Sequence, residues 1–242
     1  MARYCIELSY LGTDFAGWQN QINAVSIQET IEKGLTILLK KNTPILGSSR
    51  TDAGVHAYQQ FATFDFEGKI DIPDLSYRLN QILPFTISII AIKNVHDDFH
   101  ARFDAKSREY EYRITKLKNP FLIGRAYQFG AYLDLEKMNS ACKLLFKHTD
   151  FECFSKIHTD VKTFNCEIMR AEWIQENSNL IFHIKANRFL RGMVRAIVGT
   201  LIEVGLGKIS VADFESIILS KKRSKAGVSV PAKGLFLTKV NY

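Results

Sequence analysis

The residues most able to do chemistry lie in one stretch of small side chains. The sequence GSSRTDAGVHA covers residues 47–57 and sets Arg50, Thr51 and Asp52 among glycine, serine and alanine. Such a stretch has too little apolar bulk for a core element and too many turn formers for a helix, so we predict a tight loop that presents one carboxylate. An Asp before Ala-Gly can act in catalysis, or it can simply bond its own backbone in a turn.

No other local stretch has the signature of a nucleophile or a cofactor site. The chain contains neither a Gly-rich phosphate loop nor a G-x-S-x-G motif. His96 and His100 have the spacing of metal ligands on a helix, with acids between them, but no cysteine or third histidine is close in sequence. If the protein is an enzyme, we therefore expect a carboxylate that works without a metal or another cofactor. The scattered cysteines predict buried, reduced thiols rather than a zinc knuckle or a disulfide scaffold: Cys5, Cys142, Cys153 and Cys166.

The positive charge of the chain is concentrated in its last quarter. The formal net charge is +7, and residues 181–242 contain eleven Lys or Arg against three acids, so the rest of the chain is close to neutral. A one-sided field of this kind is typical of a protein that binds a phosphate backbone, although a solvated basic face gives the same pattern. The segment Lys221–Lys225 is expected to form an exposed basic loop.

Two elements would present further candidate groups. A long helix over residues 187–205 is predicted, and helical spacing would place Arg188, Arg191 and Arg195 on one face, where arginine suits bidentate contact with phosphate. The strand SREYEYRIT, residues 107–115, would place Tyr110 on the face that also carries Arg108 and Tyr112. Tyrosines on strands are usually packing residues, yet a phenol ring also stacks on an unstacked base.

These candidates sit in an alternation of strands and helices that predicts an α+β protein. The first cycle contains a helix opened by the sequence Ser26-Ile27-Gln28-Glu29, and a second cycle begins with residues 107–115. We therefore predict two domains, residues 1–104 with the Asp52 loop and residues 105–242 with the Tyr110 strand, the arginine helix and the basic loop. The first ten residues lack the apolar region of a signal peptide, and no run is long enough to span a bilayer, so a cytoplasmic location is expected.

Five stretches together resemble the tRNA pseudouridine synthase A family. They cover nearly the whole chain and follow the family's order: YLGTDFAGWQ from residue 10, SRTDAGVHA from residue 49, FHARFDAKSREYEYRI from residue 99, FLRGMVRAIVG from residue 189 and AKGLFL from residue 232. The resemblance implies two ferredoxin-like α+β halves that form a pseudouridine synthase fold around a basic cleft. It also implies a homodimer without a cofactor that isomerises uridines 38 to 40 in the anticodon arm of tRNA.

The resemblance further implies roles for single residues. Asp52 corresponds to the catalytic aspartate of these enzymes, and Arg195 to the arginine that pairs with it. Tyr110 corresponds to the tyrosine that stacks on the target base, and Leu235 to an apolar pocket wall. Arg50 and His56, which flank the aspartate, are expected to touch RNA, as are Arg188 and Arg191.

Two other functions remain open from the residues alone. A non-catalytic RNA-binding protein or chaperone would use the same basic surface and would bind without turnover. A metal-dependent hydrolase would use His96, His100 and the neighbouring acids, and would lose activity to a chelator.

Overall fold

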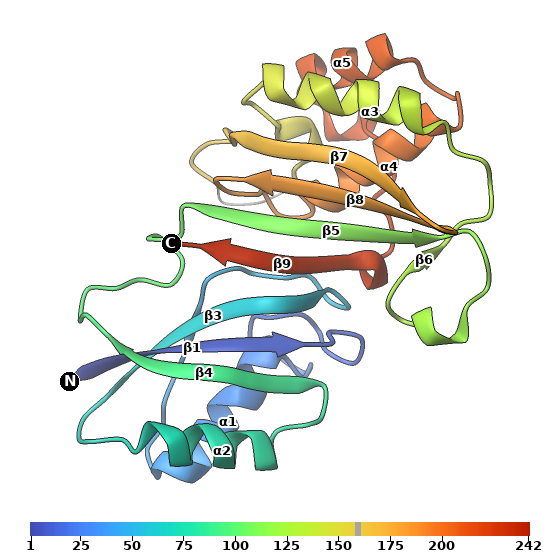
Figure 1. Ribbon diagram of the computed structural model, residues 1–242. Coiled ribbons are helices and arrows are strands. Elements are labelled where there is room, and N and C mark those ends of the chain that lie inside the picture. Colours follow the sequence, from blue (N-terminus) through green and yellow to red (C-terminus); the bar gives the residue numbers. More distant parts are fainter. Residues whose placement is uncertain (158–160) are drawn as a thin grey trace. The chain divides into compact units, whose positions relative to one another are not determined.

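The computed structural model describes residues 1–157 and 161–242, and they divide into two compact units (Figure 1). Unit 1 comprises Met1–Lys106 and Leu237–Tyr242, and unit 2 comprises Ser107–Phe236. The first junction, between Lys106 and Ser107, lies two residues after residue 104, where the first domain is expected to end. The last six residues of the chain belong to unit 1.

Unit 1 is an antiparallel sheet with two helices on one side. The strands are β1 (Ala2–Tyr10), β2 (Leu46–Gly47), β3 (His56–Phe66) and β4 (Ile87–Val95), and the helices are α1 (Ile27–Leu39) and α2 (Ile72–Ile82). β1 is central and pairs antiparallel with β3 on one side and with β4 on the other. The short strand β2 pairs with β3, just before the predicted Asp52 loop.

The predicted start of α1 at Ser26 is confirmed. The side chain of Ser26 accepts a hydrogen bond from the backbone N–H of Glu29 at 3.0 Å, which satisfies one free donor of the first turn. Ile27, Ile31 and Leu35 are fully buried against the sheet, as the apolar spacing predicts. The helix ends at Leu39, and the next residue, Lys40, adopts the left-handed conformation with φ of 57°.

Unit 2 also consists of largely antiparallel strands covered by helices. Its strands are β5 (Ser107–Thr115), β6 (Tyr127–Gln128), β7 (Ile168–Glu176) and β8 (Asn179–Ala186), and its helices are α3 (Leu135–Leu144), α4 (Met193–Gly205) and α5 (Val211–Ser220). β8 is paired antiparallel with both β5 and β7, and β6 runs parallel to β5. The structure is thus a mixture of helices and largely antiparallel sheets, which confirms the predicted class at this level. Short 3-10 helices complete the list: Pro120–Leu122, Leu145–Lys147, Glu152–Phe154, Arg223–Lys225 and Ala232–Gly234.

The predicted helix over residues 187–205 is wrong in its first six residues. α4 begins at Met193, directly after Gly192, whose φ of 73° is left-handed and cannot continue a helix. The preceding residues form an irregular connection in which Asn187 bonds the backbone of Glu167 through both its side chain and its main chain. Of the three arginines predicted to share one helical face, only Arg195 lies on the helix.

The strand β9 (Leu235–Asn241) begins in unit 2 and ends in unit 1, where it lies beside β3. Within unit 1, the backbone N–H of Val240 donates to the side chain of Gln59 at 3.0 Å. The hydroxyl of Tyr242 donates to the carbonyl of Ala101 at 2.7 Å, and its ring meets that of Phe61 edge-on at 5.2 Å. These contacts explain why local sequence patterns missed the return, since they join residues far apart in the chain.

Candidate active site

Asp52 lies in a tight turn between β2 and β3. The carbonyl of Asp52 accepts a hydrogen bond from the backbone N–H of Val55 at 3.1 Å, and Gly54 inside the turn has φ of 78°. The residue is half-buried, whereas Arg50 is exposed. The predicted loop is confirmed, although it ends two residues earlier than expected because β3 already begins at His56.

The Asp52 turn is held by residues 10–18, which comprise the last residue of β1 and the segment after it and which we call the bracket. The backbone N–H of Trp18 donates to the carbonyl of Thr51 at 3.1 Å, and that of Gly54 donates to the carbonyl of Phe15 at 3.3 Å. A Cβ on Gly17 would lie 2.5 Å from the Thr51 carbonyl oxygen, and one on Gly12 would lie 1.9 Å from that of Val55. The two loops therefore meet backbone to backbone, with no room for a side chain between them.

Side chains complete the attachment of this turn. The hydroxyls of Tyr10 and Thr51 share a buried hydrogen bond of 2.8 Å. On the other side of the turn, the Gln60 side chain accepts from the Ser48 hydroxyl at 2.6 Å and donates to the Ser49 carbonyl at 2.8 Å. Side-chain hydrogen bonds consequently fix the Asp52 turn both to β1 and to β3.

His56 belongs to the same attachment and differs from the expectation of an RNA contact. Its side chain is fully buried, and Nδ1 accepts a hydrogen bond from the backbone N–H of Gly12 at 3.0 Å. A buried imidazole with this partner fixes the bracket to the start of β3 and presents no surface to RNA in this conformation.

In unit 2, Tyr110 lies on the predicted face of β5. The side chains of Arg108, Tyr110, Tyr112 and Ile114 are buried, and the alternating ones of Glu109, Glu111 and Arg113 are half-buried, so the predicted alternation is confirmed. The Tyr110 ring meets that of Phe189 edge-on, with ring centroids 5.2 Å apart and planes at 89°. This neighbour leaves the ring in a defined orientation near the irregular connection before α4.

Arg195 lies in the first turn of α4 and is half-buried. Its Nε donates to the carbonyl of Val230 at 2.7 Å, and the N–H of Val230 donates to the Arg195 carbonyl at 3.2 Å. A Cβ on Gly199, one turn later, would lie 1.9 Å from the carbonyl oxygen of Val228. Residues 228–230 therefore lie close against α4 beside Arg195.

The remaining predicted residues of unit 2 and the following strand are not part of α4. Arg188 is half-buried and donates to the carbonyl of Thr163 at 3.4 Å, and Arg191 is exposed, with its carbonyl accepting from Lys156 at 2.9 Å. Leu235 is buried at the start of β9. It follows Gly234, where a Cβ would lie 2.7 Å from the ring of Tyr112.

The basic segment Lys221–Lys225 contains two kinds of side chain. Lys221 pairs with Asp150 at 2.7 Å, and Arg223 donates to the carbonyls of Ala226 and Gly227 at 3.2 and 3.1 Å and to the hydroxyl of Ser229 at 3.0 Å. Lys222 and Lys225 are exposed. The predicted exposed loop is therefore confirmed for Lys221, Lys222, Ser224 and Lys225. Arg223 is half-buried, and its guanidinium holds the segment that leads to Val230.

The two histidines considered as metal ligands bond elsewhere. Nδ1 of His96 lies 2.5 Å from a carboxylate oxygen of Asp98, and Nδ1 of His100 accepts from the backbone of Arg102 and Phe103 at 3.1 and 3.2 Å. Among residues 1–157 and 161–242, no three His, Cys, Asp or Glu side chains gather in a way that could hold a metal.

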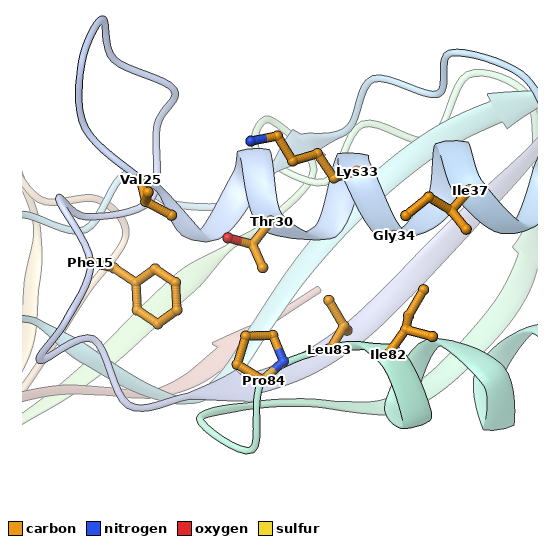
Figure 2. Close-up of a pocket in the computed structure, with 9 residues that line it drawn as sticks. All are labelled: Phe15, Val25, Thr30, Lys33, Gly34, Ile37, Ile82, Leu83 and Pro84. Atoms are coloured by element: carbon orange, nitrogen blue, oxygen red, sulfur yellow. The ribbon is translucent and has the colours of Figure 1, made fainter.

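Unit 1 also contains an open, mainly apolar pocket of about 370 Å³ between α1 and the segment after α2 (Figure 2). Figure 2 shows the ring of Phe15 at one end of it and Ile37 and Ile82 at the other. Asp52 does not line this pocket, which touches the candidate site only through Phe15, a residue of the bracket.

The bracket is the part of the site that residue chemistry missed. Tyr10, Gly12, Gly17 and Trp18 contain no catalytic group, so a search for reactive side chains passes over them. Two glycines within six residues, beside a strand end, were the available signal, since glycine permits close backbone approach.

Comparisons with known proteins first define the class. A family model described as "tRNA pseudouridine synthase" matches residues 141–242. Proteins named "tRNA pseudouridine synthase A" match over the full length: that of Parabacteroides distasonis is 50% identical across 100% of this chain and 96% of its own. The corresponding protein of Bacteroides fragilis is 51% identical across 99% and 96%, and that of Clostridium kluyveri is 39% identical across 97% of both chains.

The chain belongs to the tRNA pseudouridine synthase A family, whose members are isomerases that convert uridine to pseudouridine. In the described residues, no helix is both long and apolar enough to cross a membrane.

Proposed function

We propose that this protein converts uridine to pseudouridine in the anticodon stem-loop of tRNA, at positions 38 to 40, with Asp52 as the catalytic group. The observation that carries the proposal is the 50% identity to a protein named tRNA pseudouridine synthase A, which extends over the whole chain. The half-buried carboxylate on a turn fixed by the bracket supports the choice of Asp52.

The chemistry requires one reactive carboxylate and a means to hold the base. The N1–C1′ bond of uridine breaks, the uracil turns while it stays bound, and a bond forms between C5 and C1′, after which the proton on C5 moves to solvent or a base and N1 is protonated. Asp52 can begin the reaction by attack on C1′ or by removing a proton from the sugar, and carboxylates perform comparable steps at the anomeric carbon in glycoside chemistry. Neither route needs a metal or nucleotide cofactor.

Arg195 and Tyr110 are proposed to assist this step. A guanidinium that pairs with Asp52 would keep the carboxylate ionised when the substrate excludes water. Nε of Arg195 donates to the Val230 carbonyl, and a guanidinium has four further N–H groups, which can donate to a carboxylate. Tyr110, oriented by Phe189, would stack on the uracil, which must leave the helical stack to react, and Leu235 would form an apolar wall.

Binding of the tRNA is assigned to basic residues around these groups. Arg50 and Arg191 are exposed and can contact phosphates, and Arg188 lies in the same connection as Arg191. We further propose that each unit corresponds to one ferredoxin-like half of the pseudouridine synthase fold, that residues 1–104 and 105–242 approximate these halves, and that the protein acts as a homodimer. The substrate would place the enzyme in the cytoplasm, where tRNA is found.

The test compares Asp52→Ala with the surface variant Asp97→Ala on unmodified tRNA. Asp97 is an exposed acid of the same unit, so its variant controls for the lost charge. We expect Asp52→Ala to abolish pseudouridine formation while tRNA affinity changes less than tenfold, or about 1.4 kcal/mol, because the carboxylate offers chemistry but repels phosphate. Wild-type binding without any turnover would support a non-catalytic RNA-binding protein, and loss of activity to a chelator would support a metal enzyme.

A second series addresses Arg195. Arg195→Ala should lower turnover, and Arg195→Lys should restore it only in part, because lysine lacks the planar fork of guanidinium donors. Full activity in the lysine variant would show that charge alone is required and would remove the proposed bidentate pairing.

A further inference from the structure

We propose that Tyr10 is a positioning residue for the reaction, because its hydroxyl, bound to that of Thr51, fixes the turn on which Asp52 reacts. The inference rests on the proposed catalytic role of Asp52. Tyr10 does not touch the reacting atoms in this scheme; it acts through Thr51.

Tyr10 is held by the central strand of unit 1. It is the last residue of β1, the strand with a partner on each side, and it faces Ala57 of β3 and Ile87 of β4. Its ring is buried, with 3% of its surface exposed, and lies 6.2 Å from that of Trp18 between centroids. The phenol oxygen is therefore a fixed point of the sheet rather than of a mobile loop.

Thr51 is restrained twice, by the Tyr10 hydroxyl at its side chain and by a backbone hydrogen bond at its main chain. Its hydroxyl lies 2.8 Å from that of Tyr10, and its carbonyl accepts from the N–H of Trp18 at 3.1 Å. The carbonyl also lies against Gly17, where a Cβ would approach to 2.5 Å. The planar peptide between Thr51 and Asp52 passes on this restraint, because it fixes the Cα of Asp52, from which the carboxylate-bearing side chain extends.

Loss of the hydroxyl pair should loosen the turn without detaching it. In a Tyr10→Phe protein, the backbone hydrogen bonds from Trp18 to Thr51 and from Gly54 to Phe15 remain. The phenylalanine ring still fills the buried site of the tyrosine ring. The turn would keep its position on average but gain freedom at Thr51. A displacement of about 1 Å at a reacting group can lower the rate on the order of 100-fold, so a small gain in freedom is measurable in the chemical step.

The experiment measures single-turnover pseudouridine formation at saturating enzyme, tRNA affinity and melting temperature for Tyr10→Phe. The matched control is Tyr242→Phe, which also removes a tyrosine hydroxyl bond of unit 1, that of 2.7 Å to Ala101. We expect the single-turnover rate of Tyr10→Phe to fall about tenfold or more, with affinity within about twofold and melting close to that of the control. A Tyr10→Phe rate equal to that of Tyr242→Phe would overturn the proposal.

Variants of Thr51 separate positioning from a direct role of its hydroxyl. Thr51→Ser keeps the hydroxyl and should keep the rate, whereas Thr51→Val keeps the shape and should lose as much as Tyr10→Phe. The double variant Tyr10→Phe/Thr51→Val should lose no more than either single variant, because both break one contact. An additive loss would mean that Thr51 acts without Tyr10 and would refute the inference. A wild-type protein without turnover would instead refute the proposed function.

Discussion

Replacing Arg223 with alanine should destabilise unit 2 while leaving the salt dependence of tRNA binding unchanged. The guanidinium donates three hydrogen bonds, of 3.0 to 3.2 Å, to residues 226–229. That segment continues to Val230, whose carbonyl receives Nε of Arg195. Arg223 thus supports the placement of the proposed catalytic arginine although its charge first indicated a phosphate contact.

The size of the effect follows from these contacts. A hydrogen bond to a charged group contributes about 1.5–3 kcal/mol to stability. Arg223 is only half-buried, however, and in the alanine variant water can bind the carbonyls that the guanidinium leaves. We therefore expect a loss of about 2 kcal/mol, which corresponds to a fall in melting temperature of about 4–8 °C for a chain of this size. Lys222→Ala, an exposed neighbour, should change stability by less than about 0.5 kcal/mol.

The assay pairs thermal melting with tRNA affinity at several salt concentrations. If Lys222 contacts a phosphate, Lys222→Ala should flatten the slope of log affinity against log salt by roughly 0.7–0.9, and Arg223→Ala should not. An unchanged melting temperature of Arg223→Ala, together with a flatter slope of log affinity against log salt, would refute the reasoning. It would show that Arg223 binds RNA rather than supporting the fold.

Three further predictions concern unit 1 and the thiols. Gly17→Ala should cost more stability than Gly207→Ala, because both have positive φ but only Gly17 would also clash with the backbone of Thr51; equal melting shifts would contradict this. The hydrogen bonds from Arg3 hold the pKa of Asp65 below its usual value, so the pair stabilises the fold above about pH 4 and loses that effect as the pH falls through the lowered pKa. The free energy of unfolding of the wild type should therefore exceed that of Asp65→Asn by about 0.2–1 kcal/mol near pH 7, and the two values should converge in acid. Denaturation curves that give the same difference in unfolding free energy at every pH would argue against this linkage. All four cysteines are buried, and burial raises the pKa of the Cys5 thiol to about 12, so a thiol reagent at pH 8 should label none of them in the native protein and all of them in denaturant.

Local patterns predicted the elements whose signal lies within one element. The alternation in residues 107–115 placed Tyr110 and Tyr112 on the buried face, and Ser26 marked the first residue before α1. Each of these depends on side-chain spacing or on a cap within a few residues, so the sequence contains the whole signal.

Elements that depend on distant contacts were missed or misplaced. The apolar spacing through Leu190 and Met193 continues across Gly192, yet the left-handed conformation of that glycine separates the connection from α4. The sequence showed a histidine beside the Asp52 loop, but it could not show that His56 is buried, since its burial depends on the bracket around Gly12. In the same way, the charge of Arg223 indicated RNA, and only the structure shows the carbonyls it bonds.

Because residues 237–242 complete unit 1, the order of synthesis and the order of folding differ in this chain. The ribosome adds all of unit 2 before Val240 and Tyr242 become available to Gln59, Phe61 and Ala101. At about 5–20 residues per second, the nascent unit 1 waits on the order of ten seconds with the part of β3 that later receives β9 still unpaired, although Ala62 and Thr63 on that side are already paired with β2. An open strand edge is prone to wrong pairing, so the newly made chain is most vulnerable to aggregation in the unit that carries the catalytic candidate.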